Sequence, residues 1–242
     1  MNTLIMKNKE ILKEFVSICE ENDLWYSMDN LSLLSFFNGY ILDENIEHFE
    51  VMMQYKDYEK LKYLYPQRVL DSMSHSEYFS PQNLFISANK KEYNLENNVF
   101  IKINLLIPSN QKNILNYLKF KNRKRAFMSH YLHYYDLKNF SNKFKSFLAK
   151  ILKPSTKLIN YKDIYEILYI QNAEGYIATE GLIKKNSHRK WLPNLNLKVH
   201  KKSFDNFDVN VLENYDLYLS NIFGDYKNIK SFASVNINQQ EE

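Results

Sequence analysis

Residues 25–58 constrain the fold most, because strand-like and helix-like segments alternate within this one stretch. Its apolar spacing and turn residues predict strands at 24–28 and 48–51, and helices at 30–37 and 56–64. In the second strand His48 and Glu50 point one way, while Phe49 and Val51 point the other. Side chains two positions apart on a strand can hold a divalent metal ion against the phosphates of a nucleotide.

Three other segments carry clear apolar patterns. Residues 8–23 predict an amphipathic helix, and Cys19 lies on its apolar face, so the thiol is predicted to pack in the core. Residues 98–108 predict a buried strand, and 110–168 a helical region that Pro154 interrupts. A last helix is predicted before Gly224, which is a natural C-terminal cap. Its apolar face would hold Leu212, Tyr215, Leu219, Ile222 and Phe223.

Composition indicates one well-packed domain. The chain has 242 residues, of which 45% are hydrophobic and 15% aromatic, and this excludes a disordered protein. We predict one domain over 1–229 and a polar tail over 230–242. The net charge of +4, from 32 basic and 28 acidic residues, permits an anionic ligand or an acidic membrane surface without requiring either.

The sequence predicts a cytoplasmic protein. Its single cysteine excludes an internal disulfide framework and fits a reducing compartment. Lysines occur so early that the N-terminus has no apolar region of a signal peptide, and no apolar run is long enough to span a bilayer. Gly-rich phosphate loops, Cys/His zinc sets and nucleophile elbows are also missing from the sequence.

Three segments of this chain align, in order and without an insertion or deletion, with a known family pattern. They are Asn30-Leu31-Ser32-Leu33-Leu34-Ser35, Ile46-Glu47-His48-Phe49-Glu50-Val51 and Met53-Gln54-Tyr55-Lys56-Asp57-Tyr58-Glu59. They resemble a Gly-Gly-Thr-Leu-Leu-Gly turn, an Asp-Asp-Asp-Ile-Asp-Val run and a Met-Pro-Arg-x-Asp-Tyr-Glu segment. That order is typical of the LicD/fukutin-type family of choline-phosphate and polyol-phosphate transferases. A gapped alternative moves the acidic motif to Asn45-Ile46-Glu47, but it breaks the continuous match into Asp57-Tyr58.

The last quarter of the chain also resembles this family. Lys190-Trp191-Leu192-Pro193 is similar to its Trp-Phe-Pro, and Phe223-Gly224-Asp225-Tyr226 to its Tyr-Gly-Asp-Tyr. Between them, Phe204–Val211 is similar to a Phe-bearing strand. The resemblance covers most of 8–227 and is thin over about 65–180.

The resemblance implies an α/β (α+β) domain of nucleotidyltransferase type, with a mixed sheet and surrounding helices. It implies transfer of a phospho-alcohol, such as phosphocholine, from a CDP-linked donor to a surface glycan, with Mg²⁺ or Mn²⁺ as cofactor. Glu50 and His48 are then the predicted catalytic and metal-binding residues, with Glu47 as a further ligand. Asp29 and Ser32 are predicted on the phosphate side of the donor.

Important residues of the family's site are replaced in this chain. His48 stands in place of an acid, and imidazole suits Mn²⁺ or Zn²⁺ better than Mg²⁺. The family's third metal carboxylate falls on Leu105, with Asn104 and Lys102 nearby. Two hypotheses therefore remain: a transferase with a remodelled metal site, and a catalytically silent relative that binds a nucleotide, a glycan or an active partner subunit.

Simpler interpretations remain for each candidate residue. Ser32 could only cap a helix, and His48 with Glu50 could be an exposed polar pair at a sheet edge. His130 and His133 are three apart on a helix, a spacing that suits either a metal or aromatic packing.

The basic run at 119–125 has five basic residues in seven positions. Arg123 and Arg125 are predicted to bind the donor diphosphate or another polyanion. A solvated helix face is the simpler interpretation of such a run. A nucleic-acid binder is a third hypothesis, which rests only on this run and on the pI of about 8.8.

Overall fold

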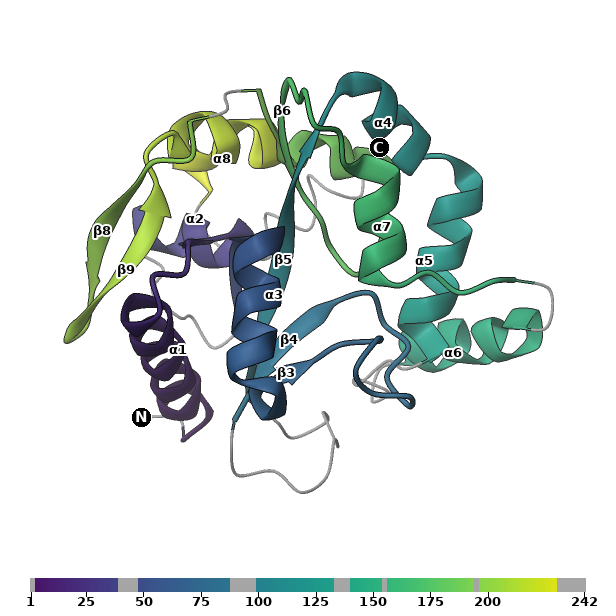
Figure 1. Cartoon of the computed structure of the whole chain (residues 1–242), viewed down its shortest axis with the longest axis horizontal. Helices are drawn as coiled ribbons and strands as arrows, with labels where there is room; N and C mark the ends of the chain where they lie inside the picture. The colour runs from purple at the N-terminus through teal and green to yellow at the C-terminus, as the bar shows by residue number, and fades with distance from the viewer. Residues whose placement is uncertain are drawn as a thin grey trace.

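The structure is a computed structural model, and it describes residues 3–38, 48–87, 99–132, 140–153, 156–193 and 196–229 (Figure 1). Its α-helices are α1 (Thr3–Glu21), α2 (Asn30–Asn38), α3 (Tyr55–Leu64), α4 (Gln111–Tyr117), α5 (Phe120–Leu132), α6 (Phe140–Leu152), α7 (Tyr161–Leu168) and α8 (Tyr215–Phe223). Its strands are β1 (Tyr26–Met28), β2 (Phe49–Gln54), β3 (Val69–Leu70), β4 (Asn83–Ile86), β5 (Phe100–Ser109), β6 (Gly175–Ala178), β7 (Trp191–Leu192), β8 (Val199–Phe204) and β9 (Phe207–Leu212).

Within these described ranges, seven strands form one mixed sheet in the order β1-β2-β5-β4-β3, with β6 on β5 and β7 on β6. The β2 and β5 strands run parallel, with Glu50 opposite Lys102, whereas β1 is antiparallel to β2 and β4 to β5. Helices surround this sheet, and α3 is drawn in front of β5 in the view of Figure 1. The predicted mixed sheet with surrounding helices is confirmed.

The predicted unit at 25–58 is confirmed in its strands and helices, to within two residues at each end, except that β2 extends three residues beyond the predicted end, to Gln54. The buried strand predicted at 98–108 is β5, whose residues are mostly buried because it pairs with β2, β4 and β6 at the centre of the sheet. Between α3 and β5 the chain also contributes β3 and β4, two strands that were not predicted from the sequence. Such short strands leave little periodicity in a sequence.

The main hydrophobic core extends from Ile11 on α1 to Ile229 near the C-terminus. Phe15 of α1 packs edge to face on Tyr26 and on Phe85, with ring centroids 5.3 Å apart in both pairs. The prediction that Cys19 packs in this core is confirmed, since the side chain is buried and burial raises the pKa of its thiol.

The β8–β9 hairpin holds the C-terminal part of the chain against β1. The backbone N–H of Leu212 donates to Ser27 Oγ over 2.9 Å, and Leu212 ends β9 rather than belonging to the last helix as predicted. The helix α8 begins only at Tyr215, and Gly224 caps it with a φ of 68°. The predicted polar tail at 230–242 lies outside the described residues. In the part of the chain that the structure describes, no helix combines the length and apolarity needed to cross a membrane.

Candidate functional site

Polar and charged side chains from four strands or their ends meet on one face of the sheet, and we call them the polar row. Its members are Asp29, Asn30, Glu50, Lys102, Asn104 and Glu180, joined by Lys190 from the turn before β7. The register explains the meeting, because Glu50 pairs with Lys102 in β5 and Asn104 follows two positions later on the same face.

Asp29 is the most enclosed carboxylate of the row, with no exposed surface. Its Oδ1 accepts hydrogen bonds from the Tyr218 hydroxyl and from the Asn30 backbone N–H, both over 2.7 Å. Its Oδ2 accepts from Asn104 Nδ2 over 2.7 Å and lies 3.6 Å from the ammonium nitrogen of Lys190. Both oxygens of Asp29 are therefore occupied by protein donors.

Glu50 is held by amide and ammonium groups from both sides. Asn30 Nδ2 donates to its Oε2 over 3.0 Å, and Lys102 Nζ lies 3.4 Å from its Oε1. Burial would raise the pKa of this carboxyl, but Lys102 and Lys190 outweigh burial and lower it. Glu50 is consequently a carboxylate at neutral pH.

Lys190 lies inside the carboxylate cluster with only 5% of its surface exposed. Its Nζ is 2.7 Å from Glu180 Oε1. Burial favours the neutral amine, but Asp29, Glu180 and Glu50 together raise the pKa of Lys190 above its usual value. The same lysine lowers the pKa of Glu180 against the effect of burial. The row thus contains a permanent ammonium ion between carboxylates.

The predicted phosphate-side residues Asp29 and Ser32 both lie at this site. The Ser32 hydroxyl accepts a hydrogen bond from the Glu50 backbone N–H over 2.8 Å and is fully buried. It therefore ties the start of α2 to β2, and the simpler interpretation of Ser32 as a helix cap is wrong, because its partner lies on a strand.

The predicted metal ligands are only partly brought together. His48 stacks on Phe100 with ring centroids 3.6 Å apart, and burial, followed by the charge of Lys102, lowers the pKa of His48 to about 3. Glu47 and the gapped alternative at 45–47 lie outside the described residues. Among the residues that are described, no three His, Cys, Asp or Glu side chains are arranged to hold a metal ion.

The interpretation of His48 and Glu50 as an exposed pair at a sheet edge is wrong. The strand β2 lies between β1 and β5 rather than at an edge, and Glu50 has 12% of its side chain exposed. The alignment that assigned the family's third metal carboxylate to Leu105 also chose a residue outside the polar row. Leu105 is buried in the core, whereas Asn104, one residue earlier, faces Asp29. Alternation along a regular strand puts these two neighbours on opposite faces.

Arg125 of the basic run has a structural role. Its guanidinium donates to the carbonyls of Lys157 and Leu158 over 3.0 and 2.9 Å, and to Asp163 over 3.1 Å. It thereby fastens α5 to the start of α7. Beside it, Lys121 and Lys124 line a groove of about 780 Å³ that also carries acidic side chains.

Arg123 of the same run makes a different contact. Its guanidinium carbon lies 5.9 Å from the ring centroid of Phe120, on the same helix. The prediction that Arg123 and Arg125 bind a diphosphate stays a prediction. His130, also on α5, meets Tyr131 edge to face at 5.0 Å, as aromatic packing predicts, while His133 is not among the described residues.

We expect Arg125→Lys to lower the free energy of unfolding by about 2 kcal/mol, because a lysine cannot reproduce the three hydrogen bonds of the planar guanidinium. Urea denaturation followed by circular dichroism measures this loss. Arg123→Lys, on the same helix, is the matched control and should lose less. If Arg125→Lys is as stable as the wild type but binds an anion more weakly, Arg125 binds a ligand rather than stabilising the fold.

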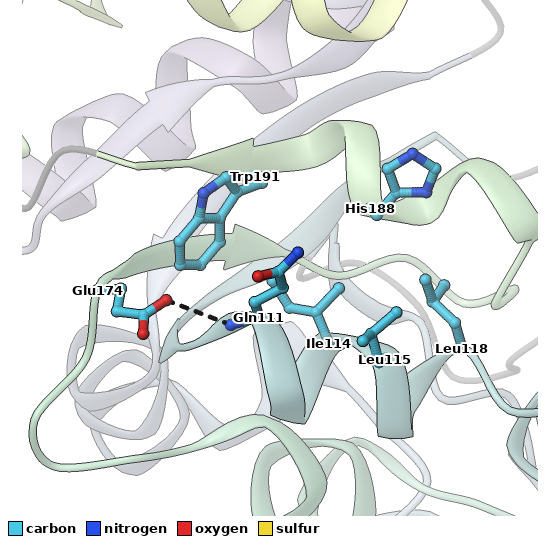
Figure 2. A pocket seen from close by; sticks show the side chains of 7 residues that line it. All are labelled: Gln111, Ile114, Leu115, Leu118, Glu174, His188 and Trp191. Atoms are coloured by element: carbon cyan, nitrogen blue, oxygen red, sulfur yellow. Dashed lines mark hydrogen bonds between the residues drawn. The ribbon is translucent and has the colours of Figure 1, made fainter.

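Figure 2 shows a separate cavity of about 410 Å³ between α4 and the turn that leads into β7. Its lining is mainly apolar, with Glu174 and His188 at the edge; the lining residues are Gln111, Ile114, Leu115, Leu118, Glu174, His188 and Trp191. The Trp191 ring lies against Gly175, where a Cβ atom would come within 2.7 Å of the ring. Lys190 and Trp191 are neighbours in sequence, but Lys190 points into the polar row whereas Trp191 lines this cavity.

Sequence reasoning did not assign Asn30, Glu180 and Lys190 to the site, nor Tyr218, whose hydroxyl donates to Asp29 of the row. The sequence contains one indication for Glu180, which lies in the loop two positions after β6. Loops at the ends of strands often carry functional residues. Lys190 had no such indication, since its partners Asp29 and Glu180 are chosen by the fold.

Comparisons of this chain with protein-family models, with curated proteins and with solved structures found no match. The geometry and charges of the polar row are therefore the basis of the functional proposal.

Proposed function

We propose that the protein is a catalytically silent relative of the LicD/fukutin-type transferases, which acts as a binding or partner subunit. The observation that carries this proposal is the position of Lys190, whose ammonium ion lies 2.7 Å from Glu180 and 3.6 Å from Asp29. A fixed cation of the protein supplies the charge that a metal ion would otherwise supply to these carboxylates.

The backbone at Asn30 supports the relationship to this family. Asn30 has a φ of 51°, in the left-handed region that favours glycine, and it falls on the first glycine of the family's Gly-Gly-Thr motif. A chain descended from such a glycine turn would keep this conformation most easily with asparagine, which tolerates the left-handed region better than most residues.

The side chain of Asn30 supports the proposal that the protein is catalytically silent. A glycine at this turn leaves room for a phosphate to approach the backbone. Here the Asn30 carboxamide fills that side of the site and donates to Glu50 over 3.0 Å and to Glu180 over 3.4 Å. The Asn30 side chain at this turn therefore binds Glu50 and Glu180 of the same chain, and it occupies the space that a bound anion would need.

The donor set of the row does not fit a divalent metal ion. Mg²⁺ requires oxygen ligands in near-octahedral geometry, with lone pairs free to face it. Asp29 accepts three hydrogen bonds on its two oxygens and has the Lys190 ammonium 3.6 Å away, and Asn104 offers an amide nitrogen at the place where a third carboxylate is expected. His48, the predicted second ligand, lies against Phe100. We derive no catalytic step through a metal.

A transferase with a rebuilt metal site is the second candidate, and one contact favours it. Because Glu50 Oε2 and Glu180 Oε1 both lie within 3.4 Å of Asn30 Nδ2, the two carboxylates are close enough to share a cation if Asn30 moved away. Glu50 would then hold the metal, with a CDP-linked donor and a glycan acceptor as substrates.

Calorimetric titration of CTP and CDP-choline into the full chain distinguishes these candidates. Each nucleotide is titrated with Mg²⁺, with Mn²⁺ and with a chelator, on wild type, Glu50→Gln and the control Glu166→Gln. A silent relative gives the same affinity with and without metal in all three proteins. Metal-dependent binding that only Glu50→Gln loses would overturn silence and establish the transferase site. If no cytidine nucleotide binds, a protein partner becomes the remaining ligand of the proposal.

A further inference from the structure

The helix α6 presents a row of large apolar side chains to solvent, which we call the α6 stripe. Its members are Phe140, Phe144, Phe147 and Ile151, with exposed fractions of 83%, 54%, 58% and 57%. At 3.6 residues per turn these four positions fall within an arc of about 60°. They therefore form one continuous ridge along the helix rather than scattered exposed residues.

The opposite face of α6 is the one that packs on the protein. Ser146 and Ala149 are buried there, and Ala149 joins Met128 and Tyr131 in a small cluster against α5. The helix thus turns its small side chains inward and its largest apolar side chains outward. A surface helix normally does the reverse, so the stripe is not part of this chain's core.

The charged side chains that α6 itself carries are all positive. Lys143 and Lys150 are exposed and follow the stripe along one side of the helix, and α6 contains no acidic residue. Lys153 extends the positive charge just beyond the helix end. Whatever covers the stripe has to accept aromatic rings and lysine ammonium groups together.

This combination decides between possible occupants. A second copy packed stripe to stripe would bring two lysine-rich helices together, and like charges at that distance repel. The interface of an anionic bilayer accepts both features, since aromatic rings enter the acyl-chain boundary while lysines reach the phosphates above. The position of α6 at the edge of the molecule, at the lower right of Figure 1, suits contact with a flat surface.

We propose that α6 docks the protein on an anionic phospholipid surface, lying in the plane of the interface with Phe144 and Phe147 inserted and with Lys143 and Lys150 at the headgroups. This proposal rests on the stripe alone and does not depend on the chemistry of the polar row. It describes peripheral binding that is reversible and sensitive to salt.

Co-sedimentation of the full chain with vesicles tests the proposal. Vesicles of phosphatidylcholine with phosphatidylglycerol are compared with vesicles of phosphatidylcholine alone, at low and high salt. The protein should bind the anionic vesicles, and Phe144→Ser/Phe147→Ser should reduce the partition coefficient at least about tenfold, because each buried ring contributes strongly to transfer from water. Lys143→Gln/Lys150→Gln should remove most of the salt dependence.

Tyr63→Ser is the matched control, because Tyr63 is 84% exposed on α3, away from the stripe. It should bind vesicles like the wild type, and all variants should keep the wild-type thermal midpoint, since the replaced side chains are exposed. Equal binding to both kinds of vesicle at low salt would overturn the proposal, as would unchanged binding of the double serine variant. A dimer in sedimentation velocity that only the double serine variant loses would also overturn it, and would assign the stripe to a second copy.

Discussion

Lys190→Met is expected to lower the free energy of unfolding by about 3–5 kcal/mol at pH 7, because it leaves buried carboxylates without their cation. Lys190 is 5% exposed and lies 2.7 Å from Glu180, so water cannot replace the lost charge. Methionine keeps most of the side-chain volume, which limits the cavity contribution to the loss. Urea denaturation of wild type and variant measures the difference.

The pH dependence of this variant has a defined sign. In the wild type the folded-state pKa values of Glu50 and Glu180 lie below the ordinary glutamate value of 4.5. Their stabilisation is therefore present above that pH and is lost as the pH falls through the folded-state pKa values. Without Lys190 we expect these pKa values to rise, so the variant loses stability as the pH rises through them. The difference in the free energy of unfolding between the wild type and Lys190→Met should therefore become smaller from pH 7 toward pH 4.5.

Lys201→Met is the control for this experiment. Lys201 forms an ion pair of 2.6 Å with Glu20, but both side chains are about half exposed, so the midpoint of unfolding should hardly change. A Lys190→Met protein as stable as the wild type at pH 7 would mean that the carboxylates do not depend on the internal cation. The proposal of a protein-supplied cation at this site would then be wrong.

Asn104→Asp is expected to lower the free energy of unfolding by about 2–4 kcal/mol at pH 7. The Asn104 amide donates to Asp29 Oδ2 over 2.7 Å, and an aspartate would put a second carboxylate at that distance from a fully buried one. Two such carboxylates cannot both ionise easily, so one takes up a proton with a raised pKa. The variant should therefore gain stability, relative to the wild type, as the pH falls from 7 toward 5.

Thermal unfolding of Asn104→Asp with and without Mn²⁺ extends this test. Asn104→Leu removes the same hydrogen bonds without adding charge, so it should show a smaller pH effect than Asn104→Asp and no response to metal. Stabilisation of the aspartate variant, but not of the leucine variant, by Mn²⁺ would support the proposed relationship to metal-dependent transferases. Equal stability of Asn104→Asp and wild type at pH 7 would contradict the contact on which the argument depends.

The sequence alone determined the local elements of this protein. The helical spacing of Leu12 and Phe15 predicted α1, the apolar run before Pro108 predicted β5, and the alternation around Glu50 predicted β2. These predictions succeeded because periodicity reports which side of an element is buried, and that information is local. The grouping of Asp29, Ser32 and Glu50 at one site came instead from the resemblance to the LicD/fukutin-type family, whose motifs fall on this short stretch.

Only the tertiary structure decided what surrounds these residues. Lys190 reaches Asp29, and Glu180 reaches Asn30, from 150 or more positions away in the chain. The fold also decided that the Arg125 guanidinium contacts the carbonyls of 157 and 158 and the carboxylate of Asp163. The register between β2 and β5 chose Asn104 instead of Leu105 for the row. Such choices depend on which strands pair and on one-residue shifts of register, because each shift turns a side chain to the opposite face.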